Sequence, residues 1–447
     1  MSEKMSAENE GETIPICITK SKSDLKEYRI FNLHCGLEVL LVDSSKLAES
    51  RKNSLGAKAT SSTAAAAMFV SVGSFADPAE AEGCAHFLEH MIFMGVNSSK
   101  YPRSENLYDS FVSSHGGSCN AFTEGEHTVY QFDVSEEHFY AALDIFACCF
   151  KTPLLAVGSS DREIKSIESE FNLAKVSDGT RLQQLMCDSA TNGHVLRKFS
   201  WGNMRSLSTV PKSKNFDIHS ILRGFYRKHY VPSKMKLVVM APKPLEELES
   251  EVIKSFGDWK LHKEPQVSPE DFVGKGNKSK RQKKAARLPP VELRSLEDCI
   301  SKFRSVSPFP KQNCTYISRV IPVKRAHKLI LTWYMPPSMH EYKTKPGSYL
   351  SHLIGHEGPG SLLTALKVFS FGHFLISEVY DSQLLSAILH YTVLYCTVLY
   401  HTVMNMPHYD ILYNTMLLYH SILYRAMLCR TVRLHYDSYL NSCIVPP

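Results

Sequence analysis

Two histidines and a glutamate share the short segment Cys84-Ala-His86-Phe-Leu-Glu89-His90. On a helix, His86 and His90 would lie one turn apart on the same face, so both imidazoles could reach one metal ion. Glu89 would fall on nearly the same face and could take a proton from a metal-bound water without being a ligand itself. The order His-x-x-Glu-His is a signature of zinc-dependent peptide hydrolysis.

A pattern of five residues also arises by chance, as two histidines on a helix surface beside a glutamate. The flanking residues argue against this alternative, because Phe87, Leu88, Met91 and Ile92 are all apolar. A helix that is apolar on its remaining faces is buried, and its histidines are then buried with it. We therefore interpret the segment as one part of a metal site.

A catalytic zinc ion needs a third protein ligand, and the acidic segment from Asp161 to Phe171 offers one. Glu163 and Glu170 are seven positions apart, which places them two turns apart on one face of a helix, while Glu168 points away. One carboxylate could bind the metal while the other hydrogen-bonds a ligand histidine. A solvated acidic face is the alternative. Helical geometry alone does not choose between Glu163 and Glu170.

Strand and helix patterns interleave around these segments from about residue 25 to residue 260. Apolar and alternating runs predict strands on both sides of a turn at Gly36, over 64–75, near 128–134 and over 236–240. Helical patterns dominate from 85 to about 150 and from 161 to about 187, with an aromatic helix around 225–230. The polar segment from Lys46 to Thr63 predicts an exposed loop. Interleaved elements of this kind indicate an α+β sandwich.

The composition is that of a globular protein with a substantial core, since 43% of the 447 residues are hydrophobic and 21% are charged. The net charge of +6 is modest for this length, so neither nucleic acid nor a membrane is expected as a partner. The twelve cysteines are scattered, and the first thirteen residues include four glutamates. Scattered cysteines and an acidic start indicate a cytoplasmic protein without a disulfide framework.

The regions on either side of 25–260 differ in composition from this domain. Residues 1–24 are predicted to be disordered. Residues 261–310 contain several prolines and a basic run over 275–287, and they predict a linker. A nuclear address or a patch that binds polyanions is the alternative for the basic run.

The last part of the chain changes character twice. Residues 311–367 resume globular patterning, with a strand over 328–334, and predict part of a second domain. Residues 368–447 are rich in Tyr, Leu, His and Thr and predict a low-complexity tail of unclear structure. The apolar run 384–404 is interrupted by histidines and lacks the basic flanks of a membrane span, so we do not interpret it as one.

The chain resembles the pitrilysin (inverzincin) zinc metallopeptidases, the insulinase-like family M16, and within them nardilysin-like proteins most closely. The resemblance rests on ordered motifs over about residues 25–260 and 314–367, among them Gly73–Pro78, His86–Gly95, His115–Thr123, Trp201–Asn203 and Gly355–Leu363. It implies the pitrilysin-type (LuxS/MPP-like) metallohydrolase fold, an α/β sandwich, with one complete domain and part of a second.

The resemblance also implies a role for individual residues. It assigns His86, His90 and Glu170 as the ligands of one zinc ion per chain and Glu89 as the general base. It places Glu163 at a second acidic position, which supports the site. Its implied substrate-binding residues are Asn120 and Ala121, on an edge strand where peptides pair by strand addition, and Phe93, near the cleaved bond.

The function implied is that of a zinc-dependent metalloendopeptidase of the nardilysin and insulysin type, which hydrolyses peptides with a zinc-bound water activated by Glu89. Family members are much longer than this chain, so the chain resembles a truncated member, and weak or absent turnover is expected from this chain alone. The segment Lys46–Thr63 is short and holds one acidic residue where animal nardilysins carry an acidic insert. This difference leaves the preferred cleavage site open. The alternative is an inactive homologue that binds peptides or partners.

Overall fold

The computed structural model describes residues 12–13, 18–55, 62–259, 291–303, 308–309, 318–324, 327–335, 339–368, 374–381 and 387–395. The chain divides into two compact units, Met1–Val306 and Ser307–Pro447. Among the described residues, no helix combines the length and the apolar character needed to cross a membrane.

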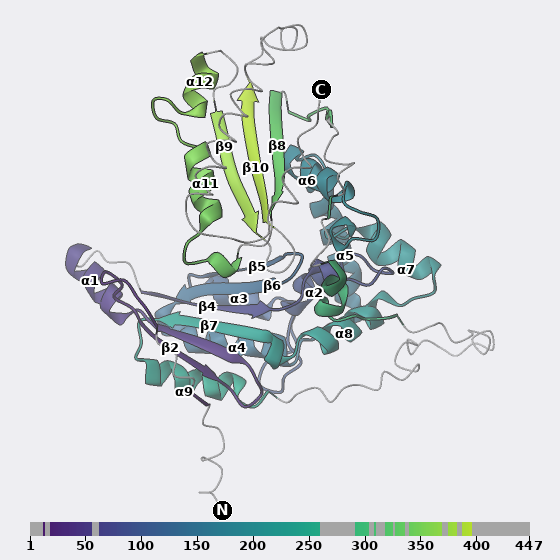
Figure 1. Ribbon diagram of the computed structural model, residues 1–447. Helices are drawn as coiled ribbons and strands as arrows, with labels where there is room; N and C mark the ends of the chain where they lie inside the picture. Colours follow the sequence, from purple (N-terminus) through teal and green to yellow (C-terminus); the bar gives the residue numbers. More distant parts are fainter. Residues whose placement is uncertain are drawn as a thin grey trace, which may run out of the picture. The chain divides into compact units, whose positions relative to one another are not determined.

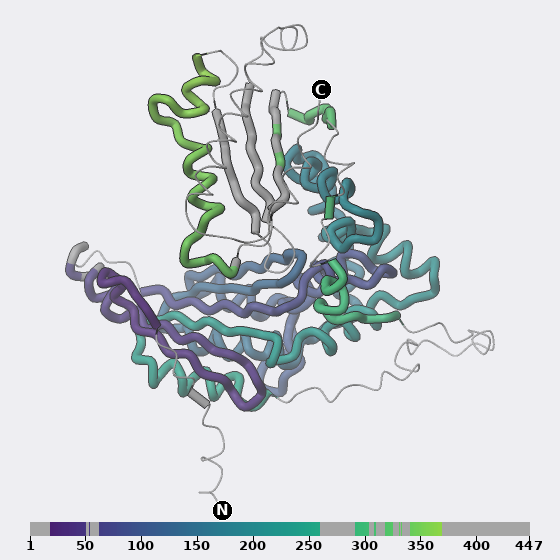
Figure 2. Tube along the Cα trace, viewed as in Figure 1, coloured from purple at the N-terminus to yellow at the C-terminus, as the bar shows by residue number. Residues whose placement is uncertain are grey.

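A seven-stranded sheet forms the centre of the first unit, in the order β1-β2-β3-β7-β4-β6-β5 (Figure 1). The strands are β1 (Glu12–Thr13), β2 (Glu27–Asn32), β3 (Glu38–Asp43), β4 (Thr63–Val70), β5 (Ser118–Thr123), β6 (Thr128–Ser135) and β7 (Met235–Ala241). Neighbouring strands are antiparallel except β3 and β7, which are parallel. Figure 2 shows β3 and β7 side by side although they lie far apart in the sequence.

One face of this sheet is buried beneath helices. Met68, Tyr130 and Val239 are fully buried, whereas Val238 and Met240 are each 37% exposed. Because successive residues of a strand point to opposite faces, this alternation gives the sheet one core face. Two helices that contact this sheet, α4 (Phe139–Lys151) and α9 (Leu245–Phe256), carry apolar residues that belong to the same core.

The remaining α-helices of the first unit include the one that carries His86, Glu89 and His90. They are α1 (Ser45–Leu55), α2 (Cys84–Ile92), α3 (Leu107–Ser114), α5 (Val157–Ala174), α6 (Asp178–Asp188), α7 (Val210–Ser213), α8 (Ile218–His229) and α10 (Leu296–Ile300). Among them, α2 contacts α5, α8 and β5. These contacts fix α2 against two other helices and the last strand of the sheet.

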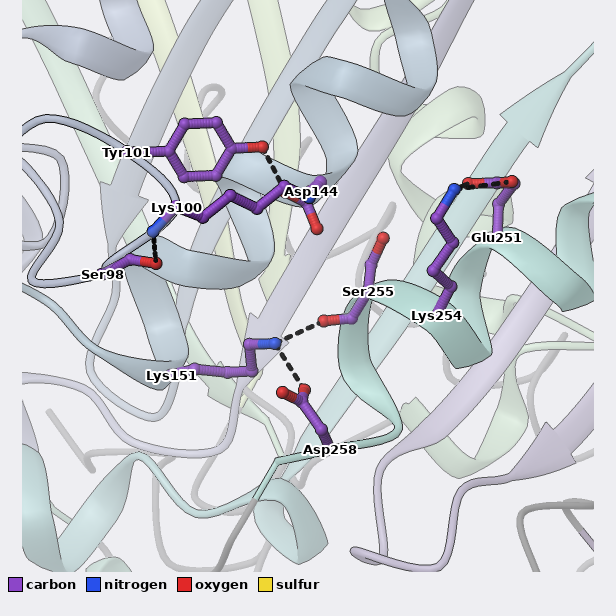
Figure 3. A network of polar contacts seen from close by, with 9 residues as sticks. All are labelled: Ser98, Lys100, Tyr101, Asp144, Lys151, Glu251, Lys254, Ser255 and Asp258. Atoms are coloured by element: carbon purple, nitrogen blue, oxygen red, sulfur yellow. Dashed lines mark hydrogen bonds and ion pairs between the residues drawn. The ribbon is translucent and has the colours of Figure 1, made fainter. Parts of the chain in front are cut away.

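Polar contacts tie α4 to its surroundings at its middle and at its C-terminal end (Figure 3). Asp144 accepts hydrogen bonds from the Tyr101 hydroxyl and from Lys100 Nζ, the latter at 2.6 Å. At the end of α4, Lys151 Nζ donates to the carbonyl of Ser255 at 2.7 Å and to Asp258 at 2.6 Å. The loop that follows α2 and the end of α9 are therefore both anchored to the same core helix.

The second unit contains a three-stranded antiparallel sheet in the order β8-β10-β9. Its elements are β8 (His327–Met335), α11 (Pro346–Ile354), α12 (Leu362–Val368), β9 (Phe374–Asp381) and β10 (Ala387–Tyr395). Leu350, Ile354, Leu363 and Leu366 on the two helices are buried. They are the described core of this unit.

Within the region 25–260, one segment differs from the sequence prediction, and another was predicted by the resemblance but not by the local pattern. The predicted loop Lys46–Thr63 begins with α1, because its Lys, Leu, Ala, Glu and Arg residues are strong helix formers despite their polarity. Strand β5 lies in a region where helical patterns dominate, but the resemblance placed Asn120 and Ala121 on an edge strand, and β5 is that strand. Its alternation is only weakly apolar, because the core-facing residues include the small Cys119 and Ala121 while the large Phe122 is exposed.

Differences also occur outside the region 25–260. Glu12–Thr13 pair with β2, within the segment predicted to be disordered. Helix α10, with Cys299 and Ile300 buried, lies within the predicted linker, where a capping box of Ser295 and Asp298 starts it. Strands β9 and β10 occupy part of the predicted low-complexity tail. The basic run 275–287 and the residues after 395 lie outside the described residues.

Candidate metal centre

Helix α2 carries the histidine pair, and it begins after a glycine in a left-handed conformation. The preceding residue, Gly83, has a left-handed conformation with φ 91°, which favours glycine. The carboxylate of Asp77 accepts hydrogen bonds from the backbone N–H groups of Gly83, at 2.7 Å, and Ala85, at 2.8 Å. A buried carboxylate thus satisfies backbone donors that the first turn of a helix leaves unpaired.

Gly83 also allows a close approach between α2 and a distant loop. A Cβ atom at Gly83 would lie 2.2 Å from the Cα atom of Gly202, so the contact requires a glycine. The neighbouring carbonyl of Trp201 lies 2.6 Å from Nδ1 of His86. Since a carbonyl only accepts hydrogen bonds, Nδ1 carries the proton and Nε2 of His86 remains available as a ligand atom.

The second histidine is held in the same manner by a carboxylate. Nδ1 of His90 lies 3.1 Å from Oε2 of Glu163 on α5 and donates a hydrogen bond to it. Nε2 of His90 is thereby directed away from Glu163 and remains available as a ligand atom. A hydrogen-bonded Nδ1 is the usual arrangement for a histidine that binds metal through Nε2.

Glu170, two turns beyond Glu163 on α5, completes the cluster. Its carboxylate oxygens lie 3.6 Å from Nε2 of His90 and 3.7 Å from Nε2 of His86. Ligand atoms of the three residues all lie within 4.8 Å of one another. The structure thus brings His86, His90 and Glu170 together, whereas Glu163 contacts the Nδ1 side of His90. Helical spacing alone did not decide which of the two glutamates joins the histidines.

This donor set fits a zinc ion. Two imidazole nitrogens and one carboxylate are a known catalytic zinc set, and a fourth position stays open for water or substrate. A tetrahedral ion with bonds of about 2.0–2.2 Å separates its ligand atoms by roughly 3.3–3.6 Å, close to the separations between Glu170 and the histidines. The residues present therefore match the requirements of the metal.

Electrostatics of the metal-free cluster favour a bound cation. Burial lowers the pKa of His90, but hydrogen bonds and charges from Glu163 and Glu170 outweigh it and raise the pKa to about 9. The hydrogen bond with His90 lowers the pKa of Glu170. Without metal, the positive charge of a protonated His90 offsets the negative charge of the carboxylates. A divalent cation bound there would offset the same negative charge.

Glu89 lies on the same helix, and its side chain is buried, at 9% exposed. Its Oε2 accepts a hydrogen bond of 2.5 Å from the hydroxyl of Thr123, at the end of β5. Asn120 is exposed and Ala121 is partly buried on the same strand. Sequence reasoning gave no role to Thr123 or Trp201, although both lie inside motifs that it identified.

Phe93 follows the last residue of α2 and packs within an aromatic cluster. Its ring centroid lies 4.8 Å from that of Tyr108 and 5.3 Å from that of Tyr130. This packing explains the partial burial of Phe93 without a substrate. Contact between Phe93 and a bound peptide stays a prediction.

Known families and proteins resemble this chain in sequence. The insulinase model of peptidase family M16 matches residues 55–198, and the model of the inactive M16 domain matches residues 219–390. A nardilysin-like protein of Arabidopsis thaliana is 39% identical over 330 residues, which are 73% of this chain and 28% of that protein. Human insulin-degrading enzyme is 35% identical over 350 residues, 78% of this chain and 29% of that enzyme.

A solved structure shows the fold to which the chain is similar. The crystal structure of pitrilysin superimposes with a TM-score of 0.66 at 24% identity, covering 86% of this chain and 35% of that chain. The predicted pitrilysin-type fold is therefore confirmed. The model of the inactive M16 domain matches as far as residue 390, which is beyond residue 367, the end of the motifs that carry the resemblance. Strands β9 and β10 lie in the part of the chain after residue 367. The chain spans under a third of the length of these curated relatives.

Two family models together cover most of the described chain. The sequence is also similar to that of a nardilysin-like protein and that of insulin-degrading enzyme, and the fold is that of pitrilysin. This chain belongs to peptidase family M16 and is nardilysin-like in sequence.

Proposed function

We propose that this chain carries the active site of a zinc-dependent metalloendopeptidase that acts on peptides, as its nardilysin and insulin-degrading relatives suggest. The observation that carries the proposal is the convergence of His86, His90 and Glu170 within 4.8 Å, with Glu89 on the same helix as the histidines. A zinc ion held there would act as a Lewis acid toward water and the peptide carbonyl.

Each side chain of the cluster has a separate task in this proposal. His86, His90 and Glu170 bind the metal, and one zinc ion is expected per chain. The Trp201 carbonyl and Glu163 hold the two imidazole rings so that Nε2 faces the ion. Glu89 accepts a proton from the attacking water and later delivers it to the leaving amine, as a general base and then a general acid.

The substrate is proposed to pair with β5. This strand is the last of the sheet, and β6 is its one partner among the described residues. The outer edge of such a strand presents backbone N–H and C=O groups that an extended peptide can pair with. Asn120 and Ala121 lie on this strand, and its end at Thr123 contacts Glu89. A paired peptide would therefore be led toward the general base.

Cleavage of a fluorogenic peptide by the purified, zinc-loaded chain tests the proposal. We expect cleavage by this chain to be weak, to be abolished by a chelator and restored by added zinc, and to be eliminated by Glu89→Gln while zinc stays bound. Glu168→Gln is the matched control, since Glu168 accepts a hydrogen bond from the backbone of Met204 at 2.7 Å and lies outside the cluster. A zinc-loaded wild-type chain that binds peptides without cleaving them would instead favour the inactive, peptide-binding homologue.

We further propose a cytoplasmic location. The seven described cysteines are free thiols, as is usual in reducing compartments. One relative, 36% identical, is an insulin-degrading enzyme-like protein of Arabidopsis thaliana named as peroxisomal. Imaging of the tagged protein distinguishes the two compartments.

A further inference from the structure

A side-chain hydrogen bond joins the helix that carries Glu89 to the edge strand of the sheet. The hydroxyl of Thr123 donates to Oε2 of Glu89 at 2.5 Å, across 34 positions of sequence. Thr123 is the last residue of β5, and Glu89 lies in the middle of α2. Folding, rather than local sequence, brings the two side chains together.

Glu89 depends on this contact because it is buried. Within the described part of the chain, Thr123 is the one hydrogen-bond donor to its carboxylate. Burying a charged group without a partner costs more free energy than burying a neutral one. A hydroxyl that donates to a carboxylate makes a strong, charge-assisted bond that also fixes the orientation of the acceptor.

The pairing of Thr123 within the sheet does not require a hydroxyl at this position. Thr123 pairs with Thr128 across the two strands, and the Thr128 hydroxyl donates to the carbonyl of Val72 at 2.9 Å. Valine suits a strand position as well as threonine does. The Thr123 hydroxyl is therefore explained by Glu89 and not by strand formation.

We propose that Thr123 is a positioning residue that holds one oxygen of Glu89 and leaves the other oxygen for proton transfer. The catalytic meaning of this inference rests on the proposed function, whereas the contact itself does not. Since Thr123 ends the strand that carries Asn120 and Ala121, a peptide paired with β5 would also steady the residue that orients the base. Substrate pairing and placement of the base are thereby linked through one hydroxyl.

A double-mutant cycle on the purified full chain tests the contact without requiring turnover. Thr123→Val is measured in the wild-type background and in Glu89→Met, which has a similar length and no carboxylate. We expect Thr123→Val to lower the melting temperature by several degrees in the wild type and much less in Glu89→Met. Thr123→Ser keeps the hydroxyl and should retain most of the melting temperature.

Thr128→Val is the matched control, because it removes a sheet hydroxyl that does not contact Glu89. It should lower the melting temperature equally in both backgrounds. An equal loss for Thr123→Val in the two backgrounds would overturn the proposal. Should Thr123→Val fail to fold, Thr123→Ala is carried through the same cycle.

The kinetic readout separates positioning from general stability. We expect Thr123→Val to lower kcat about tenfold or more with KM and zinc content little changed, and Thr123→Ser to restore kcat. A change in KM with kcat unaltered would contradict the assignment. If the zinc-loaded wild type cleaves no peptide, the proposed function fails, and the melting cycle still decides whether Thr123 and Glu89 are coupled.

Discussion

Nδ1 of His90 donates a hydrogen bond to Oε2 of Glu163 at 3.1 Å, and the Glu163 side chain is only 16% exposed. This bond orients the imidazole ring toward Glu170. We predict that Glu163→Ala weakens zinc binding by roughly 10–100-fold, the usual effect of removing such a partner. Competition with a chromogenic chelator measures the change.

The same experiment has an internal control on the same helix. Glu168→Gln alters a carboxylate of α5 that contacts Met204 and not the histidines. It should bind zinc as the wild type does. Equal zinc affinity in Glu163→Ala and the wild type would show that Glu163 does not support His90.

A second prediction concerns the close approach of Gly83 and Gly202. Gly83→Ala places a Cβ atom 2.2 Å from Gly202 in a residue with φ +91°. We expect it to lower the free energy of unfolding by roughly 3–5 kcal/mol, because left-handed strain and overpacking act together. Gly193→Ala also has a positive φ, of +78°, but its Cβ meets nothing within 4 Å. It should cost only about 1–2 kcal/mol, and similar losses in the two variants would contradict the packing argument.

A third prediction concerns pH. Burial raises the pKa of Asp77 from 3.8 to about 7, in spite of the hydrogen bonds from Ala85 and Gly83. Between these values the folded chain holds a proton that the unfolded chain has lost, so the contribution of Asp77 to stability falls as pH rises from about 4 to about 7. Above that range it is constant. Asp77→Asn removes this titration.

Denaturant unfolding of the metal-free protein at several pH values measures the effect. We expect the difference in unfolding free energy between the wild type and Asp77→Asn to fall by a few kcal/mol across the range, since one pKa unit is worth about 1.4 kcal/mol. A difference that stays constant between pH 4 and pH 7 would mean that the Asp77 pKa is not raised by folding.

The sequence predicts the elements whose periodicity is strong and local. The spacing of His86, Glu89 and His90 among apolar residues predicts a buried helix, and α2 is one. The strands around Gly36 and the strand β7 follow from apolar runs in the same way. In contrast, β5 has only a weak apolar alternation, since its core-facing residues include the small Cys119 and Ala121, and α1 is polar although its residues favour a helix.

The composition of the site depends more on tertiary contacts than on spacing. Helical geometry places Glu163 and Glu170 on one face of α5 but does not say which one reaches both histidines. That depends on how α5 lies against α2. The contacts of Trp201 with His86 and of Thr123 with Glu89 join residues 115 and 34 positions apart. No local pattern predicts such contacts.

The zinc content of the purified chain tests the central claim most directly. Elemental analysis after equilibration with zinc and removal of the excess should give about one zinc ion per wild-type chain. Glu170→Gln and His90→Ala should lose this zinc while remaining folded by circular dichroism, and Glu168→Gln should keep it. A correctly folded wild-type chain that holds no zinc would contradict the account.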